Sequence, residues 1–260
     1  MHLHLHPDVK QCFPDSESVF DQIMSLKGET YRHQKGRHTQ RIALGGKHYF
    51  IKHHHGVGWR EIIKNLLQGR LPIISAKQEW LALKKLESIN IAVPKVLGYG
   101  HRGLNPAKRQ SFILMEELAD TISLEKLCHD WKEKPPTFSF KRRLIEEVAM
   151  IARALHQNGI NHRDFYICHF LLYQQDLARI KLYLIDLHRA QVRRLTPERW
   201  VIKDLAALYF SSAQIRLTRN DLYRFMKTYH RASLRELLTL GKTFWSKVQN
   251  RGKGYRDHTS

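Results

Sequence analysis

The chain has 260 residues, of which 42% are hydrophobic, so it is long enough to bury a core without disulfide or metal support. Its 44 Lys and Arg residues exceed its 24 Asp and Glu residues by 20, and this excess predicts attraction to polyanions. The three cysteines lack the paired spacing of a zinc site or disulfide framework, which favours a reducing compartment, the cytosol.

The basic residues are spread along the whole sequence. This distribution favours a charged face for an anionic substrate or lipid surface over a nucleic-acid-binding arm, so no nucleic-acid partner is expected. No stretch approaches the roughly 18 apolar residues that cross a bilayer, and the first residues lack the pattern of a signal peptide.

The first part of the chain is predicted to be rich in strands. Residues 41–44 and 47–52 flank Gly45-Gly46, a two-residue turn typical of a β-hairpin. Residues 59–67 and 77–86 have helical periodicity, and the apolar run 110–116 predicts a strand that leads into a hinge.

Helices are predicted to dominate from Lys141 onward. Apolar residues at helical spacing over 144–155 predict a helix that stops before Gly159, and residues 170–173 with 180–185 predict a second hairpin. Thr196-Pro197 is read as the cap and first-turn proline of a helix that runs to Leu208. Residues 218–221 have the form of a capping box with Asp in place of Glu.

This layout predicts an α+β, bilobed, protein-kinase-like fold. A sheet-rich lobe would span residues 1–116, and a helix-rich lobe would span residues 117–260.

Two acidic motifs follow one another in the second part of the chain. Asn161-His162-Arg163-Asp164 resembles the catalytic loop of protein kinases, and Leu184-Ile185-Asp186-Leu187-His188 resembles their metal-binding segment. Asp164 is therefore the candidate catalytic base at the acceptor hydroxyl, and Asp186 is the candidate ligand of Mg²⁺ on the ATP phosphates. The alternative for each is a structural role, as a turn residue or as the cap of a strand.

Four further residues fit supporting roles in phosphoryl transfer. Lys52, at a strand end, is the candidate cation for the ATP phosphates, and Glu79 is its candidate ion-pair partner. Asp204 is expected to brace the catalytic loop through its backbone amides, with an acid on a helix surface as the alternative, and Arg163 is assigned a supporting role. Met115 and Glu116, at the expected hinge, are assigned to nucleotide binding.

Histidine and cysteine clusters suggest other chemistry. His53-His54-His55 is interpreted as a polar loop and not a metal site, and the alternating residues His2, His4 and His6 are expected to fray at the terminus. Cys168 with His162 or His169 would suit a thiol hydrolase, although the apolar residues around Cys168 favour packing.

The segments Gly159–Leu172 and Ile185–Gln191 together resemble the heptose kinase branch of the lipopolysaccharide kinase (Kdo/WaaP) family, and the resemblance extends from about Gly28 to Tyr229. It implies ATP- and Mg²⁺-dependent phosphorylation of the first heptose of the lipopolysaccharide inner core. The expected partners are the lipid-anchored core oligosaccharide, the anionic cytoplasmic face of the inner membrane and, in some members, an acyl carrier protein. By this resemblance Lys52, Glu79, Asp164 and Asp186 are the phosphate-binding lysine, helix glutamate, catalytic aspartate and metal aspartate.

The chain departs from the ordinary protein-kinase pattern at three places. Residues 31–39 stand where a Gly-rich loop would precede Lys52, which puts backbone cradling of the phosphates in doubt. His169 replaces the expected metal-binding Asn, so it is assigned either to a weak second metal site or to a phosphate contact. Asp186-Leu187-His188 replaces Asp-Phe-Gly, and no regulated activation segment follows it.

Two alternatives stay open from the sequence. The acceptor could be a neighbouring core sugar, Kdo or the second heptose. A kinase-shaped protein that binds polyanions or membranes without catalysis would also have this charge.

Overall fold

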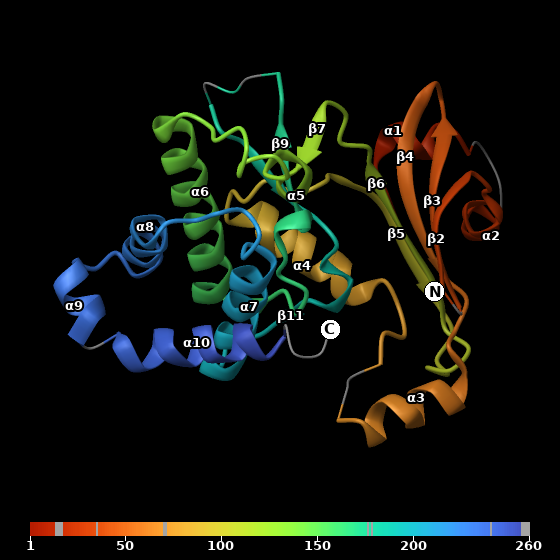
Figure 1. Ribbon diagram of the computed structural model, residues 1–260. Helices are drawn as coiled ribbons and strands as arrows, with labels where there is room; N and C mark the ends of the chain where they lie inside the picture. Colours follow the sequence, from red (N-terminus) through yellow and green to blue (C-terminus); the bar gives the residue numbers. More distant parts are fainter. Residues whose placement is uncertain are drawn as a thin grey trace. The chain divides into compact units, whose positions relative to one another are not determined.

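The computed structural model describes residues 1–13, 18–34, 36–69, 72–175, 177, 179–239 and 241–255 (Figure 1). The chain divides into two compact units. Unit 1 consists of Met1–Lys84 and Pro94–Leu118, and unit 2 consists of Lys85–Val93 and Ala119–Ser260. Unit 2 thus takes in the segment 85–93 in addition to the C-terminal part of the chain.

Unit 1 is built on a six-stranded antiparallel sheet with the strand order β1-β5-β6-β4-β3-β2 (Figure 1). Its strands are β1 (His2–Leu5), β2 (Glu29–Gln34), β3 (Arg37–Leu44), β4 (Lys47–His54), β5 (Val96–Arg102) and β6 (Gln110–Glu116). The predicted hairpin is β3 with β4, and its turn residues Gly45 and Gly46 have φ of 56° and 76°, as a two-residue hairpin turn requires. The predicted strand 110–116 is β6.

Four helices accompany this sheet. They are α1 (Pro7–Lys10), α2 (Val19–Ser25), α3 (Gly58–Leu67) and α4 (Lys77–Ser88), the last two close to their predicted bounds. Tyr49 and Ile51 of β4 pack in an apolar core with Phe20 and Ile23 of α2. Because side chains alternate along a strand, Lys52 lies on the opposite face, where it meets α4.

The expectation of a polar loop at His53-His54-His55 is wrong for its first two residues. β4 continues to His54, and the side chains of His53 and His54 are buried. His53 Nε2 donates a hydrogen bond to the carbonyl of Ile23 at 2.9 Å, and burial lowers the pKa of His53. A neutral histidine whose ring N–H has a hydrogen-bond acceptor can be buried, although histidine is a polar residue type.

The expectation of a frayed N-terminus is also wrong. Residues His2–Leu5 form β1, which pairs in antiparallel register with β5 from His2 and His101 to Leu5 and Gly98. The His2 ring also stacks on the His101 ring, with centroids 5.5 Å apart. The alternation in the sequence therefore reflects a paired edge strand.

Unit 2 is mainly helical. Its strands form the sheets β10-β9-β7 and β11-β8, with β7 (Thr121–Ser123), β8 (Ile160–Asn161), β9 (Phe170–Tyr173), β10 (Leu182–Leu184) and β11 (Gln191–Val192). Its helices are α5 (Leu124–Leu127), α6 (Phe138–Gln157), α7 (Glu198–Ser211), α8 (Arg219–His230), α9 (Leu234–Thr239) and α10 (Lys242–Gly254), with the 3₁₀ turns η1 (Ile167–His169) and η2 (Leu187–Arg189). The predicted second hairpin is confirmed as β9 with β10.

The predicted helix over 144–155 is α6, whose apolar side is buried in unit 2. One predicted cap is wrong: Pro197 occupies the N-cap position of α7, and the Thr196 hydroxyl donates instead to the carbonyl of Ile160. The predicted capping box is confirmed at α8, where the side chains of Thr218 and Asp221 each accept a hydrogen bond from the other residue's backbone amide.

Asp221 is expected to stabilise unit 2 in a pH-dependent way. Its buried carboxylate caps α8 and lies 2.6 Å from the amine of Lys141. Burial alone would raise the pKa of Asp221, but the hydrogen bonds from Lys141 and Thr218 outweigh burial and lower it. Asp221→Ala should therefore reduce the free energy of unfolding by about 1–3 kcal/mol at neutral pH.

Urea unfolding at several pH values measures this contribution. Because the pKa is lower in the folded than in the unfolded state, the stabilisation is present above the unfolded-state pKa and is lost as the pH falls through the folded-state pKa. The stability gap between the wild type and Asp221→Ala should narrow in acid, whereas Asp221→Asn, which keeps a cap acceptor, should cost less at neutral pH. A gap that stays constant down to about pH 3 would contradict the role of the charge.

Candidate active site

The catalytic-loop motif of unit 2 lies directly after β8. Gly159 precedes β8 with φ of 77°, and its amide carbonyl accepts a hydrogen bond from the amide of Arg193 at 2.8 Å. A Cβ on residue 159 would lie 1.9 Å from the Arg193 carbonyl oxygen, so glycine lets β11 approach β8 closely. The stop signal in the sequence is thus also a packing requirement of the loop.

Asp204 of α7 holds the backbone of this loop. Its Oδ2 accepts a hydrogen bond from the His162 amide at 2.6 Å, and its Oδ1 accepts one from the Arg163 amide at 2.8 Å. Asp204 has no exposed surface, and Arg163 has φ of 74°, a left-handed conformation that a non-glycine residue rarely adopts. The expected bracing contact of Asp204 is therefore present, and it stabilises a strained loop.

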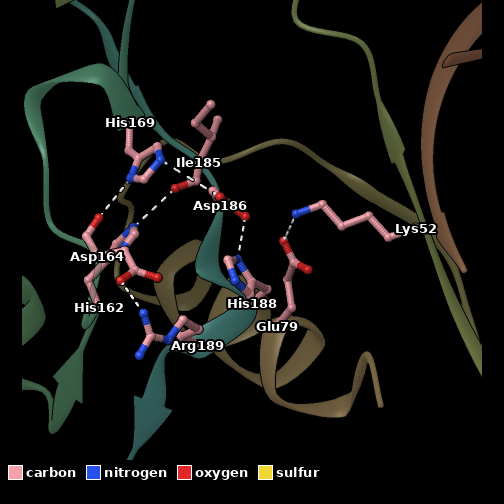
Figure 2. A network of polar contacts seen from close by, with 9 residues as sticks. All are labelled: Lys52, Glu79, His162, Asp164, His169, Ile185, Asp186, His188 and Arg189. Atoms are coloured by element: carbon pink, nitrogen blue, oxygen red, sulfur yellow. Dashed lines mark hydrogen bonds and ion pairs between the residues drawn. The ribbon is translucent and has the colours of Figure 1, made fainter. Parts of the chain in front are cut away.

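Two histidines connect the loop to the segment of Asp186 (Figure 2). His162 Nε2 donates to the carbonyl of Ile185 at 3.0 Å, and burial lowers the pKa of His162 to about 4. His169 stacks on His162 with ring centroids 5.6 Å apart, and its Nδ1 donates to the carbonyl of Asp164 at 2.7 Å. Its Nε2 lies 3.7 Å from Oδ2 of Asp186. The structure thus brings Asp164, His169 and Asp186 together.

Asp186 is held in a left-handed conformation with φ of 60°, and its carboxylate is partly exposed. His188 Nδ1 donates to its Oδ1 at 2.6 Å, which fixes the direction of the carboxylate. Within the described part of the chain, no three His, Cys, Asp or Glu side chains are grouped to hold a metal ion. A single carboxylate still fits Mg²⁺, because this ion takes most of its ligands from water and phosphate oxygens.

Asp164 has a partner that the sequence analysis did not assign. Arg189 Nη1, from η2, donates to Asp164 Oδ1 at 2.7 Å, and both side chains are partly exposed (Figure 2). The contact joins the residue proposed as the base to the segment that carries Asp186. Nothing in the spacing of the motifs indicates this pair, since Arg189 reaches Asp164 only through the turn of η2.

Cations crowd around Trp200 near the same loop. Those with charge centres 5.3–5.8 Å from the Trp200 ring centroid are Arg163, Arg193, Arg199 and Lys203. Burial and the neighbouring Arg163 and Arg189 lower the pKa of Lys203. Burial and Arg189 likewise lower the pKa of Arg163. This excess of positive charge favours an anionic ligand at the loop.

In unit 1, the predicted ion pair is present. Lys52 Nζ donates to Glu79 Oε1 at 2.6 Å, and both side chains are buried (Figure 2). Met115 is buried in the sheet, and Glu116 Oε1 accepts a hydrogen bond from the Lys95 amide at 2.9 Å. Nucleotide binding by these four residues stays a prediction.

The segment 31–39, expected to cover the phosphates, forms the end of β2, the turn at Gly36 and the start of β3. Lys35 lies outside the described residues. The structure thus has a β-hairpin where a Gly-rich loop would lie.

The thiol-hydrolase alternative finds no support at Cys168. Burial raises the pKa of this thiol to about 11, so the reactive thiolate is scarce at neutral pH. The two histidines considered for it donate to backbone carbonyls, His162 to Ile185 and His169 to Asp164. Cys168 itself is partly buried.

The model of the lipopolysaccharide kinase (Kdo/WaaP) family matches residues 21–229. This chain belongs to that family. The lipopolysaccharide core heptose(I) kinase WaaP of Pseudomonas aeruginosa is 49% identical over 222 residues, which are 84% of this chain and 83% of that protein. The protein of the same name from Escherichia coli K12 is 44% identical over 246 residues, 94% of this chain and 93% of that one.

A solved structure agrees with this assignment. "WaaP in complex with acyl carrier protein" is similar to this chain with a TM-score of 0.84 and 39% identity. The match covers 98% of this chain and 99% of the chain in that structure. The predicted family, the kinase-like α+β fold and the prediction of a phosphotransferase are confirmed.

Removal of the Asp204 carboxylate should release the catalytic loop. Asp204→Ala leaves two buried amides without an acceptor and should lower the free energy of unfolding by about 2–4 kcal/mol. Because the loop carries Asp164, kcat should fall more than KM for ATP changes. Urea unfolding and initial-rate kinetics measure the two effects.

The matched control is Asp130→Ala, which removes a carboxylate whose side chain is 71% exposed. Asp130→Ala should change stability by less than about 0.5 kcal/mol. If Asp204→Ala cost no more than this control, the bracing role of Asp204 would be excluded.

Proposed function

We propose that this chain transfers the γ-phosphoryl group of ATP to a hydroxyl of heptose I in the lipopolysaccharide core, with Asp164 at the hydroxyl and Asp186 on Mg²⁺. The chain is a kinase of the lipopolysaccharide kinase family, for which ATP is the phosphoryl donor. The His169 ring, which bonds to the Asp164 backbone and faces the Asp186 carboxylate, is the main structural support. Heptose I is the acceptor in the names of three relatives that are 43–49% identical, and this favours it over Kdo or the second heptose.

Each residue has a defined part in this reaction. Asp164 accepts the proton of the attacking heptose hydroxyl, and the bond from Arg189 keeps its carboxylate in position. Asp186 would hold Mg²⁺ through its carboxylate, whose direction is set by His188. The bound ion would neutralise charge on the phosphates. Lys52, held by Glu79, binds the ATP phosphates.

The role of His169 follows from its two contacts. Its Nδ1 donates to the Asp164 carbonyl, and its Nε2 lies on the side of the Asp186 carboxylate. Imidazole is a poor ligand for Mg²⁺, so we assign His169 to positioning, or to a weak second metal site, while Asp186 binds the ion.

We also propose that the protein acts at the cytoplasmic face of the inner membrane as a peripheral protein. In the part of the chain that the structure describes, no helix has the length and hydropathy to cross a bilayer. The formal net charge of +20 suits an anionic lipid surface and an acceptor that carries acidic groups.

An acyl carrier protein is the proposed protein partner. The similar solved structure contains one. Unit 2 contains a mostly apolar, partly open pocket of about 570 Å³ between α6, α7, α8 and α10, lined among others by Trp131, Leu144, Leu208, Phe225 and Trp245. The group that an acyl carrier protein carries is an acyl chain, and an apolar cavity of this size suits such a group.

Two aspartate variants separate the proposed roles. Asp164→Asn should lower kcat about 100- to 10,000-fold with unchanged ATP affinity, because it removes only the proton acceptor. Asp186→Asn should instead raise the Mg²⁺ concentration that gives half-maximal activity. Mass spectrometry of heptose-containing core lipid after incubation with ATP measures transfer and identifies the phosphorylated sugar.

Asp130→Asn serves as the control for loss of one carboxylate and should keep full turnover. Wild-type product with phosphate on Kdo or the second heptose would refute the acceptor assignment. Full turnover by Asp164→Asn would remove this residue from the chemical step.

The acyl carrier protein proposal is tested by thermal unfolding. The acylated carrier should raise the Tm of the wild type more than the unacylated carrier does, because the acyl chain adds apolar contacts to the folded state. Leu208→Glu, which places a charge at the cavity, should abolish that difference, while the exposed control Met150→Glu should retain it. Equal shifts from both forms of the carrier in the wild type would argue against an acyl site.

A further inference from the structure

Helix α3 carries an apolar stripe that faces solvent. Its ten residues include Trp59, Ile63, Leu66 and Leu67, which are 54%, 52%, 54% and 84% exposed. The four are spaced as i, i+4, i+7 and i+8, so they share one face of the helix. Single exposed apolar residues are ordinary, but four large ones along one short helix mark an interaction surface.

The same helix is anchored to unit 1 at one edge of this stripe and at its first residue. Ile62 is 6% exposed, and the amide of Gly58 donates to the carbonyl of Ala107 at 3.0 Å. On the polar side, Asn65 donates to the Glu61 carboxylate at 2.8 Å. The stripe is thus held outward by an anchored helix, and it is not the core face of a helix that has come loose.

Cations border the stripe. Arg60 and Lys64 are exposed and follow Trp59 and Ile63 by one position each, about 100° further around the helix. The loop that holds the start of α3, residues 103–109, carries Leu104, which is 96% exposed, and the exposed Lys108. Exposed apolar and basic residues therefore occur both on α3 and in the loop that is bonded to its first residue.

We infer that α3 is an interfacial helix that inserts its Trp59–Leu67 stripe into an anionic lipid bilayer. This inference rests on the proposed function, in which the acceptor is anchored in such a bilayer. A helix with Trp and Leu on one face and Lys or Arg beside it binds in the plane of the interface, its apolar face among acyl chains and its cations near lipid phosphates. A protein groove would also take the apolar stripe, but the bordering cations and the net charge of +20 favour the anionic lipid surface.

Flotation of the full chain with vesicles tests the inference. Vesicles of phosphatidylcholine with about one third phosphatidylglycerol should bind the wild type at least tenfold more tightly than vesicles of phosphatidylcholine alone, because roughly 1 kcal/mol of attraction per bordering cation is lost without anionic lipid. Ile63→Ser/Leu67→Ser should weaken binding to the anionic vesicles at least tenfold. Arg60→Gln/Lys64→Gln should weaken it as well, and more at low salt than at high salt.

Matched controls remove the same groups elsewhere. Met150→Ser/Leu195→Ser removes two exposed apolar side chains of unit 2, and Lys132→Gln/Lys134→Gln removes two exposed cations. Both controls should bind as the wild type does.

On anionic vesicles the tryptophan emission of the wild type should shift to the blue, and Trp59→Phe should lose most of this shift. The changed positions are exposed, so all variants should keep the Tm of the wild type.

Kinase assays separate this inference from the proposed function. On a deacylated, soluble core oligosaccharide, Ile63→Ser/Leu67→Ser should match the wild-type rate, and on vesicle-embedded acceptor its rate should fall with its binding. Wild-type protein inactive on every heptose acceptor would overturn the proposed function and leave the vesicle result standing. Vesicle binding that is unchanged in both α3 variants would overturn the interfacial role. The role would also be overturned if the α3 variants lost binding to acyl carrier protein but kept binding to vesicles.

Discussion

Two hydrogen bonds from the loop amides of His162 and Arg163 to the buried carboxylate of Asp204 are the constraint on which the site of unit 2 depends. Arg163 has a left-handed backbone at φ of 74°, which costs free energy unless its surroundings fix it. Because Asp204 belongs to α7, the packing of a helix determines where the loop lies. The position of Asp164 is thus set by the core and not by the loop itself.

The link from this loop to Asp186 consists of histidines that donate to carbonyl groups. Burial lowers the pKa of His162 to about 4, so His162 is neutral throughout the physiological range and its bond to the Ile185 carbonyl does not depend on pH there. The His169 ring stacks on it and contacts both aspartate residues. The neutral His162 ring and the His169 ring stacked on it therefore connect the backbone of the loop to the segment that carries Asp186.

The sequence predicted what depends on local patterns. The hairpin at Gly45-Gly46, the capping box at Thr218, the order of Asp164 and Asp186 and the contact of Asp204 with the loop were all accessible, because turn chemistry and motif spacing are local or shared by kinases. His53 and the N-terminal strand were not, because their placement depends on the carbonyl of Ile23 and on pairing with β5, which lie far along the chain. The bond of Arg189 to Asp164 and the cations at Trp200 likewise arise only in the folded unit.

The cations behind the net charge of +20 occur in at least two different environments, which the net charge alone does not distinguish. Around Trp200, Arg163, Arg193 and Lys203 are at least partly buried, and the pKa values of Lys203 and Arg163 are lowered. An anion bound there would offset the cost of burial and the mutual repulsion of these cations. On α3 the cations are exposed beside apolar side chains, where their repulsion is screened and their use is to orient an apolar face toward an anionic surface. The first arrangement suits a discrete acidic group of a substrate, and the second suits an extended surface. A protein that phosphorylates a sugar attached to lipid needs both, since the acceptor must be held at the reacting group while its anchor stays in the bilayer.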